Sequence, residues 1–460
     1  MRRLLRNASI IVALLLAILL PFVASGYSEL EKASLATAPL EAAEHYRAAA
    51  RRIPWRPDLY ELAGHYFYHA KEYAQADAAY QKAEGRDALS PEGWVAWGDV
   101  AYLNGNAERA SELWEQGLES PNPSAKLYAR LAEMHRQNGE YAKAADFLQR
   151  YVAVFSGDAP AHYRLGLLLT LSDPNEALSE LLHASQLDPQ FDPATQVLRT
   201  ALNLSALSET SSEGKVVIGR GLGLVEEWEL ARAAFEAAVR LDGNNAEAWA
   251  WLGEADQHTA ESEAFTYLER ALTLNPNSPV VRGLRGLYFQ RAGNHYQAVI
   301  EFQTAAKLEP ENPAWYVSIG EEFSKLGDLI LALQAYQHAT TVAPKDAQYW
   351  RLLANFCAQN NVNIPDVGIP AAERAVSLTP GDPFALDTLG WTMALGGRYY
   401  EAELYLSRAL ERDPELASAH LHLALVYMEK DDRASMYDHL IRARDLGNEE
   451  ARALLAQYFP

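Results

Sequence analysis

Residues 246–278 read AEAWAWLGEADQHTAESEAFTYLERALTLNPNS, and residues 279–312 read PVVRGLRGLYFQRAGNHYQAVIEFQTAAKLEPEN. The two stretches have nearly the same length and the same plan. Each begins with an apolar helical face around a small residue, Gly253 or Gly286, and continues after a polar break into a second helical face. Each then ends on Leu-x-Pro. Self-similarity at this period predicts a chain built from stacked repeats.

The same period recurs along most of the chain. Pro276, Pro310 and Pro344 are 34 residues apart, as are Pro380 and Pro414. This pattern resembles the tetratricopeptide repeat (TPR) family, whose unit is a helix–turn–helix of 34 residues. The resemblance covers about residues 57–450 and implies an all-α, right-handed α-solenoid. We predict eleven repeats, which start near Pro57, Pro91, Ala125, Ala159, Ser212, Ala246, Pro279, Pro313, Ala347, Pro383 and Ala417.

Each repeated position has a mechanical role. A glycine or alanine in the first helix lets the second helix approach closely, and glycine at the end of the first helix tolerates a left-handed cap at little cost. The closing proline stops the second helix because it lacks an amide donor. A single unit cannot bury its own apolar face, so neighbours must stack. The glycines expected at the caps are Gly105, Gly139, Gly293, Gly327 and Gly397.

The repeats define the domain organisation. Lead-in helices are expected over 27–56, a first array of four repeats over 57–191, and an extra helix with a break over 192–211. A second array of seven repeats follows over 212–448, with a two-residue insertion between Asn360 and Pro370. A capping helix is expected over 449–460, because a solenoid otherwise exposes its last stacking face.

Composition excludes some classes of function. The formal net charge is −21 over 460 residues, which argues against general binding of nucleic acid, because that needs basic patches. Cys357 is the only cysteine, so no intramolecular disulfide can form.

The N-terminus predicts a location. Arg2, Arg3 and Arg6 precede an apolar run from Ala8 to Val23, and small residues follow up to Gly26. This resembles a secretory signal peptide over 1–26, and the run is nearly long enough to be an uncleaved transmembrane anchor. In both cases we expect the repeats outside the cytoplasm, with membrane contact only through residues 8–26.

The sequence contains no catalytic motif. A P-loop, a nucleophile elbow and a metalloprotease helix are all absent, so no enzymatic activity, catalytic residue or cofactor is predicted. Glu61, His65 and His69 recur every four residues on one helix, where two imidazoles could hold a metal with Asp99 as a third ligand. A polar stripe lining a solvated groove explains the same spacing, and we predict no metal.

The TPR resemblance implies that protein or peptide partners bind along a groove formed by the first helices. We therefore expect a scaffold or adaptor, and the alternative is an accessory subunit of a cell-envelope glycan or secretion system. In that alternative, Trp391, Tyr68 and Tyr102 would stack on sugars. The residues expected in the partner groove are Glu254, Gln257, Gln290, Arg291, Glu321, Lys325, Arg351, Asn355, Gln359 and Trp391.

The last two repeats have an unusually apolar inner face. It is either a partner groove or the seat of the C-terminal helix that begins at Glu449, and we favour the helix. Its expected members are Phe384, Trp391, Leu395, Leu421, Leu425 and Met428.

Overall fold

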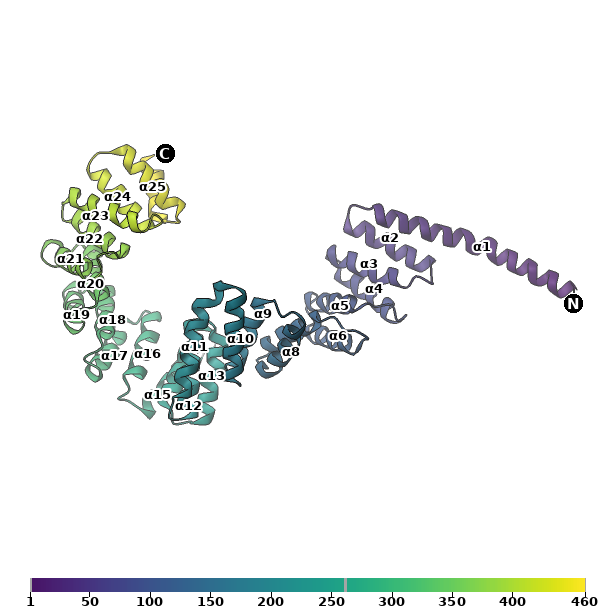
Figure 1. Cartoon of the computed structure of the whole chain (residues 1–460), viewed down its shortest axis with the longest axis horizontal. Coiled ribbons are helices and arrows are strands. Elements are labelled where there is room, and N and C mark those ends of the chain that lie inside the picture. Colours follow the sequence, from purple (N-terminus) through teal and green to yellow (C-terminus); the bar gives the residue numbers. More distant parts are fainter. Residues whose placement is uncertain (1, 260–262, 460) are drawn as a thin grey trace. The chain divides into compact units, whose positions relative to one another are not determined.

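The computed structural model describes residues 2–259 and 263–459, and within these ranges the side chains of all residues except 2–16 and 18 (Figure 1). The described residues form 26 α-helices and contain no β-strand. The prediction of an all-α repeat fold is confirmed.

Most helices form antiparallel pairs. Helices α1 (Arg2–Leu35) and α2 (Pro39–Arg52) come first. Four pairs follow: α3 (Asp58–His69) with α4 (Tyr73–Glu84), α5 (Pro91–Leu103) with α6 (Ala107–Glu119), α7 (Lys126–Gln137) with α8 (Tyr141–Val154), and α9 (Ala159–Leu169) with α10 (Pro174–Leu187). The short 3₁₀-helix η1 (Pro189–Phe191) then leads into α11 (Asp192–Ala206).

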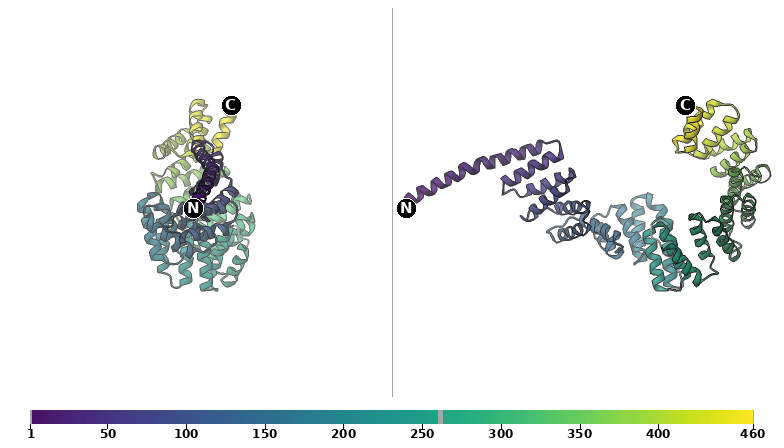
Figure 2. Two further views of the ribbon diagram at one scale, coloured as in Figure 1. Left: turned by 90° about the vertical axis from the view of Figure 1, so that its right-hand side faces the viewer. Right: turned by 180° about the vertical axis from the view of Figure 1, so that it is seen from behind.

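Seven more pairs follow α11, and their course can be traced in Figures 1 and 2. They are α12 (Ser211–Leu224) with α13 (Trp228–Leu241), α14 (Ala246–His258) with α15 (Ala264–Leu274), α16 (Pro279–Arg291) with α17 (His295–Leu308), α18 (Pro313–Lys325) with α19 (Leu329–Val342), α20 (Ala347–Asn360) with α21 (Ile369–Leu378), α22 (Pro383–Leu395) with α23 (Tyr399–Arg412), and α24 (Ala417–Glu429) with α25 (Arg433–Asp445). Helix α26 (Glu449–Tyr458) follows them.

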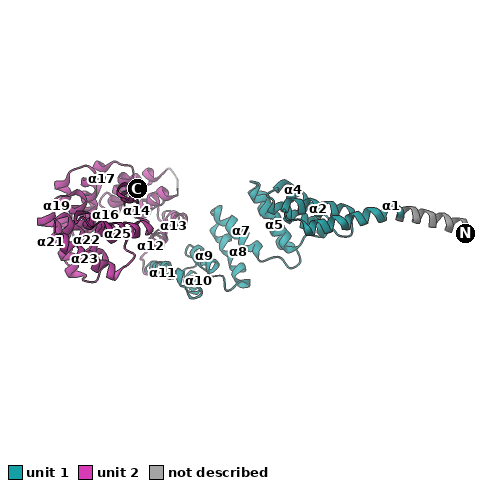
Figure 3. Ribbon diagram, turned by 90° about the horizontal axis from the view of Figure 1, so that it is seen from above, with its two compact units in different colours: residues 1–206 teal, residues 207–460 magenta. Residues whose placement is uncertain are grey.

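The chain divides into two compact units, which Figure 3 colours separately. Unit 1 comprises residues Met1–Ala206 and unit 2 comprises residues Leu207–Pro460. The division falls inside the segment 192–211, where the sequence pattern is interrupted. Helix α11 belongs to unit 1, where Thr195 donates a hydrogen bond from Oγ1 to the Leu181 carbonyl oxygen at 3.3 Å and so ties α11 to α10.

Close approach within the pairs depends on the small residue in the first helix. A Cβ atom placed on Gly98 would lie 2.1 Å from Nε1 of Trp114, and one on Gly286 would lie 2.4 Å from Cε1 of Phe302. A larger residue would therefore push the second helix away. The five capping glycines named above have φ values between +71° and +82°, in the left-handed region that glycine tolerates.

The N-terminal helix is continuous through the small residues at 24–26. Near that point Arg52 of α2 donates a hydrogen bond from Nη1 to Ser25 Oγ at 3.1 Å, and its guanidinium pairs with Glu29 at 3.1 Å. Glu29 also contacts His45 Nδ1 at 2.6 Å. A Cβ on Gly26 would lie 2.6 Å from Ile53, so α1 packs tightly on the end of α2. The second half of α1 is thus part of the packed body of unit 1.

The insertion in unit 2 forms a local distortion between α20 and α21. Asn361 and Asn363 have φ values of +50° and +47°, and the π-helix η2 (Ile364–Gly368) follows them. Asparagine tolerates the left-handed conformation better than most residues do. The two extra residues are therefore absorbed before α21, and the helix pair is kept.

Helix α26 packs on the last repeat. Its Ala451 and Leu455 are buried in one apolar cluster with Leu421, and Leu425 and Met428 pack against that cluster. Three of the six residues of the predicted apolar inner face thus contact the cluster that α26 completes.

Candidate functional site

The predicted groove residues of unit 2 lie on the first helices of five successive repeats. These helices carry Glu254 and Gln257 (α14), Gln290 and Arg291 (α16), Glu321 and Lys325 (α18), Arg351, Asn355 and Gln359 (α20), and Trp391 (α22). The interactions of these side chains differ between the two ends of the row.

At α14 and α16 the polar side chains bind one another. Arg291 donates from Nη1 and Nη2 to the two carboxylate oxygens of Glu254, at 2.8 and 2.6 Å. The amide of Gln257 and the imidazole of His258 also contact this carboxylate. Glu254 is buried, with 4% of the residue exposed. The hydrogen bond to Glu254 raises the pKa of Arg291. This cluster joins two repeats and has its charges neutralised internally.

A second buried carboxylate, that of Glu322, lies on α18, two repeats beyond Glu254. Glu322 accepts a hydrogen bond from Gln290 Nε2 at 2.6 Å and contacts His295 Nδ1 at 2.8 Å. Burial raises the pKa of the neighbouring Glu321, and the charge of Glu322 raises it further. Lys325 partly offsets that shift. The sequence placed Glu321 and Lys325 in this region, but it did not indicate that Glu322 is the fully buried acceptor.

Four of the predicted residues line one cavity of about 280 Å³, the unit 2 cavity, between α20, α22 and α24. The complete lining is Arg351, Asn355, Ala358, Gln359, Phe384, Asp387, Thr388, Trp391, Ser418 and His422. Sequence reasoning missed Asp387, Thr388, Ser418 and His422 as site residues. A signal was present for Asp387, because it occupies the position in its repeat that Arg351 occupies in the preceding one.

Asp387 organises one wall of the unit 2 cavity. One of its carboxylate oxygens contacts His422 Nδ1 at 2.7 Å, and the other accepts a hydrogen bond from Ser418 Oγ at 2.7 Å. The imidazole of His422 lies flat on Trp391, with the ring centroids 4.5 Å apart and the planes at 6°. The Asp387 charge is therefore satisfied within the wall. One face of the Trp391 ring is covered by His422, which leaves less of it for stacking on a sugar.

The rest of the cavity wall presents polar groups that can form further hydrogen bonds. Thr388 donates a hydrogen bond from Oγ1 to Asn355 Oδ1 at 3.1 Å, so the Asn355 amide nitrogen keeps its two donors for another group. Arg351 has no ion pair with any residue that the structure describes, and its guanidinium lies 5.8 Å from the centre of the Phe384 ring. Phe384 is half exposed. The wall thus offers an unneutralised cation beside an apolar ring.

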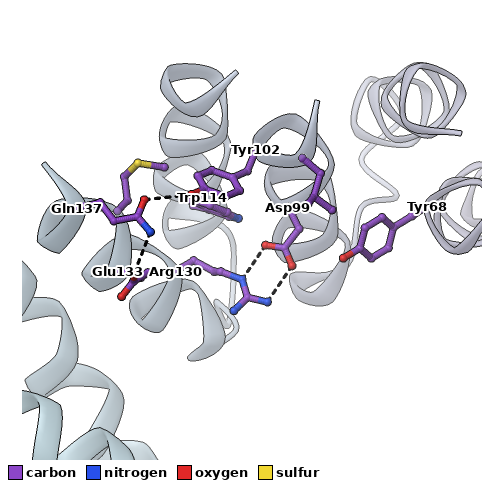
Figure 4. A pocket seen from close by; sticks show the side chains of 9 residues that line it. Tyr68, Asp99, Tyr102, Trp114, Arg130, Glu133 and Gln137 are labelled. Atoms are coloured by element: carbon purple, nitrogen blue, oxygen red, sulfur yellow. Dashed lines mark hydrogen bonds and ion pairs between the residues drawn. The ribbon is translucent and has the colours of Figure 1, made fainter. Parts of the chain in front are cut away.

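Unit 1 has a pocket of similar size, about 280 Å³, which we call the unit 1 pocket (Figure 4). Its lining is Tyr68 of α3, Asp99, Tyr102 and Leu103 of α5, Trp114 of α6, and Arg130, Glu133, Met134 and Gln137 of α7. Tyr68 and Tyr102, two of the three aromatic residues considered for sugar stacking, therefore line this pocket, whereas Trp391 lines the unit 2 cavity.

In the predicted histidine row on α3, His65 is engaged in hydrogen bonds. His65 Nε2 contacts Glu61 Oε1 at 3.2 Å, and His65 Nδ1 contacts the Tyr80 hydroxyl at 2.9 Å. Asp99 is held by Arg130 at 2.7 and 2.9 Å. Among the described residues, no group of three or more His, Cys, Asp or Glu side chains is arranged to hold a metal ion.

Comparison with known proteins identifies the repeats. One family model described as tetratricopeptide repeat matches residues 95–161 and 225–279, and another matches residues 316–346. Human superkiller complex protein 3 is 25% identical over 272 residues, which cover 56% of this chain and 16% of that protein. The peroxisomal targeting signal receptor of Candida albicans is 29% identical over 206 residues, which cover 42% of this chain and 34% of the receptor.

The match to each of these curated relatives thus spans about a third of the relative's length or less. Among solved structures, the crystal structure of yeast Tom70 aligns with 96% of this chain and 95% of its own, at 15% identity and a TM-score of 0.41.

The location outside the cytoplasm that the N-terminus predicts is wrong. Within the described residues, no helix is long and apolar enough to cross a membrane, and neither curated relative is named as an exported or anchored protein. The side chains of Arg2, Arg3 and Arg6, which prompted the secretory interpretation, lie outside the described residues.

Proposed function

We propose that this chain, a multi-repeat protein of the tetratricopeptide repeat superfamily, is a non-enzymatic scaffold that binds segments of partner proteins on the first-helix faces of its repeats. One curated relative, the peroxisomal targeting signal receptor, is named for recognising a signal carried by other proteins, and another is named as part of a complex. Both names fit a role in protein recognition.

The observation that carries the proposal is the unit 2 cavity. It is lined only by first helices, and its Arg351 guanidinium has no ion pair among the described residues. An arginine fork binds a carboxylate through two parallel hydrogen bonds, and such charge-assisted bonds are stronger than neutral ones. The Asn355 amide nitrogen is the second donor. The cavity therefore fits a carboxylate of the partner, from an acidic side chain or a chain end.

The apolar ring beside the cation adds a second requirement. Phe384 is half exposed at the mouth of the cavity, so a partner residue next to the carboxylate can bury apolar area against it. Unit 2 carries 36 Asp and Glu against 21 Lys and Arg. The net negative charge of unit 2 repels an acidic segment, so the attraction must come from short-range contacts with Arg351. We therefore expect recognition of a single carboxylate beside a large apolar residue.

The test uses the full chain and two labelled peptides, acetyl-Gly-Ser-Leu-Asp-Ser-Gly-amide and the same peptide with Asn in place of Asp. Fluorescence anisotropy measures the affinity of each. We expect the Asp peptide to bind more tightly, and Arg351→Ala to weaken its binding about tenfold or more, because hydrogen bonds to charged groups contribute about 1.5–3 kcal/mol. The Asn peptide should be little affected.

Arg374→Ala is the matched control. Arg374 lies on the second helix α21, where its Nη1 donates to Ser377 Oγ at 3.4 Å, outside the cavity. Equal weakening by the two arginine substitutions, or equal binding of the two peptides by the parent chain, would contradict the carboxylate assignment.

A further inference from the structure

The unit 1 pocket differs in chemistry from the unit 2 cavity. We propose that it is a second partner site, an anchor for one uncharged aromatic side chain of a bound protein segment. This inference does not depend on the carboxylate site, because its residues and its ligand chemistry are separate. Its volume of about 280 Å³ is just below the roughly 300–1,000 Å³ typical of drug-sized ligand sites, so it suits a single large side chain.

The charges in the lining exclude an ionic ligand. Arg130 donates from Nε and Nη2 to the two oxygens of Asp99, at 2.7 and 2.9 Å, as Figure 4 shows. Glu133 is paired in the same way with Arg136, at 2.9 Å. Each charged group in the lining is therefore already neutralised by an opposite charge. A charged ligand would lose its hydration and gain no unpaired counter-charge, so an uncharged one is favoured.

The apolar part of the lining is aromatic. Trp114 is 3% exposed and donates its indole N–H to the Val95 carbonyl oxygen at 3.2 Å, so its polar atom is already satisfied. Tyr102 packs near it, with ring centroids 6.2 Å apart, and is 40% exposed. Met134 adds a thioether, which makes favourable contacts with ring edges. Rings in offset or edge-to-face contact attract one another, so an aromatic guest gains more here than an aliphatic one.

Two hydrogen-bond donors at the rim of the pocket can bind the main chain of the partner segment. Figure 4 shows the Tyr68 hydroxyl directed toward Asp99, and this hydroxyl has no hydrogen-bond partner among the described residues. The two bonds from Arg130 to Asp99 leave Nη1 without one as well. By contrast, the Tyr102 hydroxyl already donates to Gln137 at 3.0 Å. Tyr68 and Arg130 can therefore bind carbonyl oxygens on either side of the inserted ring.

The test is a ¹⁹F NMR titration of the full chain with acetyl-Gly-Ser-(4-fluoro-Phe)-Ser-Gly-amide. Binding broadens the fluorine signal, and excess unlabelled Phe peptide should restore it. The matched peptides with Lys or Glu in place of Phe should fail to compete. We expect Tyr102→Ala to weaken binding about tenfold, because it removes both an aromatic contact and buried area.

Leu103→Glu is the second variant. Leu103 lies at the rim and is 50% exposed, so this change adds a charge to the pocket and leaves the buried core intact. It should abolish the broadening, whereas Arg351→Ala in unit 2 should leave it unchanged. Absence of broadening with the parent chain, competition by the Lys or Glu peptide, or retained binding in Leu103→Glu would each overturn the proposal. A failed carboxylate test in unit 2 would not change the results expected for the unit 1 pocket, because the two sites have separate residues.

Discussion

Gly98 gives a direct test of how the repeats pack. In Gly98→Ala the new methyl carbon would lie 2.1 Å from Nε1 and 2.3 Å from Cδ1 of Trp114, well inside van der Waals contact. The indole cannot move away freely, because it is 3% exposed and hydrogen-bonded to Val95. Overpacking typically costs about 1–3 kcal/mol, and weakening this hydrogen bond adds to it. We therefore expect a loss of about 2–3 kcal/mol in the stability of the α5–α6 pair.

Substitutions at two other glycines distinguish the effect of side-chain crowding from that of backbone strain. An added Cβ meets nothing within 4 Å at Gly157 and at Gly139, but Gly139 has a φ of +74°. Gly157→Ala should be neutral or stabilise by up to about 1 kcal/mol, because it restricts the unfolded chain. Gly139→Ala should cost about 1–2 kcal/mol through left-handed strain alone.

Hydrogen exchange measured by mass spectrometry reports these effects locally, since each repeat is stabilised mainly by its neighbours. In Gly98→Ala, the exchange of peptides within residues 91–119 should rise about 30- to 140-fold, which corresponds to 2–3 kcal/mol. Peptides from unit 2 should be unchanged. Exchange in Gly98→Ala equal to that in Gly157→Ala would refute the close packing of α5 on Trp114.

Three further outcomes are expected. Hydrogen bonding to His45 lowers the pKa of Glu29 to about 2, so this carboxylate stabilises the α1–α2 contact above about pH 5 and loses that contribution as the pH falls from about 4.5 to 2. The thermal midpoints of the parent and Glu29→Gln should therefore differ at pH 6 and converge near pH 2. Burial raises the pKa of the Cys357 thiol to about 11, so iodoacetamide at pH 8 should alkylate it only after unfolding in urea. Glu301→Ala should destabilise unit 2 by about 1.5–3 kcal/mol in urea titrations, because the buried Arg285 loses its bond to Glu301 at 2.5 Å and keeps Glu269 as its remaining acidic partner.

The sequence by itself determined the repeat fold. The small residue in the first helix, the capping glycine and the closing proline act within one helix pair, so their physical effect can be read from a single repeat and checked against the next. The capping glycines have the expected left-handed backbone, for example at Gly105 with a φ of +82°. The first-helix positions also placed Arg351, Asn355 and Gln359 on successive turns of one helix and Trp391 on the next first helix, and these four line one cavity.

The tertiary structure alone decided which polar side chains are free. Arg291 and Arg351 look alike in sequence, but Arg291 is bound by Glu254 and Arg351 has no such partner among the described residues. These pairings join residues more than 30 positions apart and depend on how neighbouring repeats are rotated and which rotamers their side chains adopt. The same applies to Asp99 and Arg130, whose pairing makes the unit 1 pocket neutral. Repeat periodicity fixes which face a residue occupies, whereas charge neutralisation on that face is set by contacts across repeats.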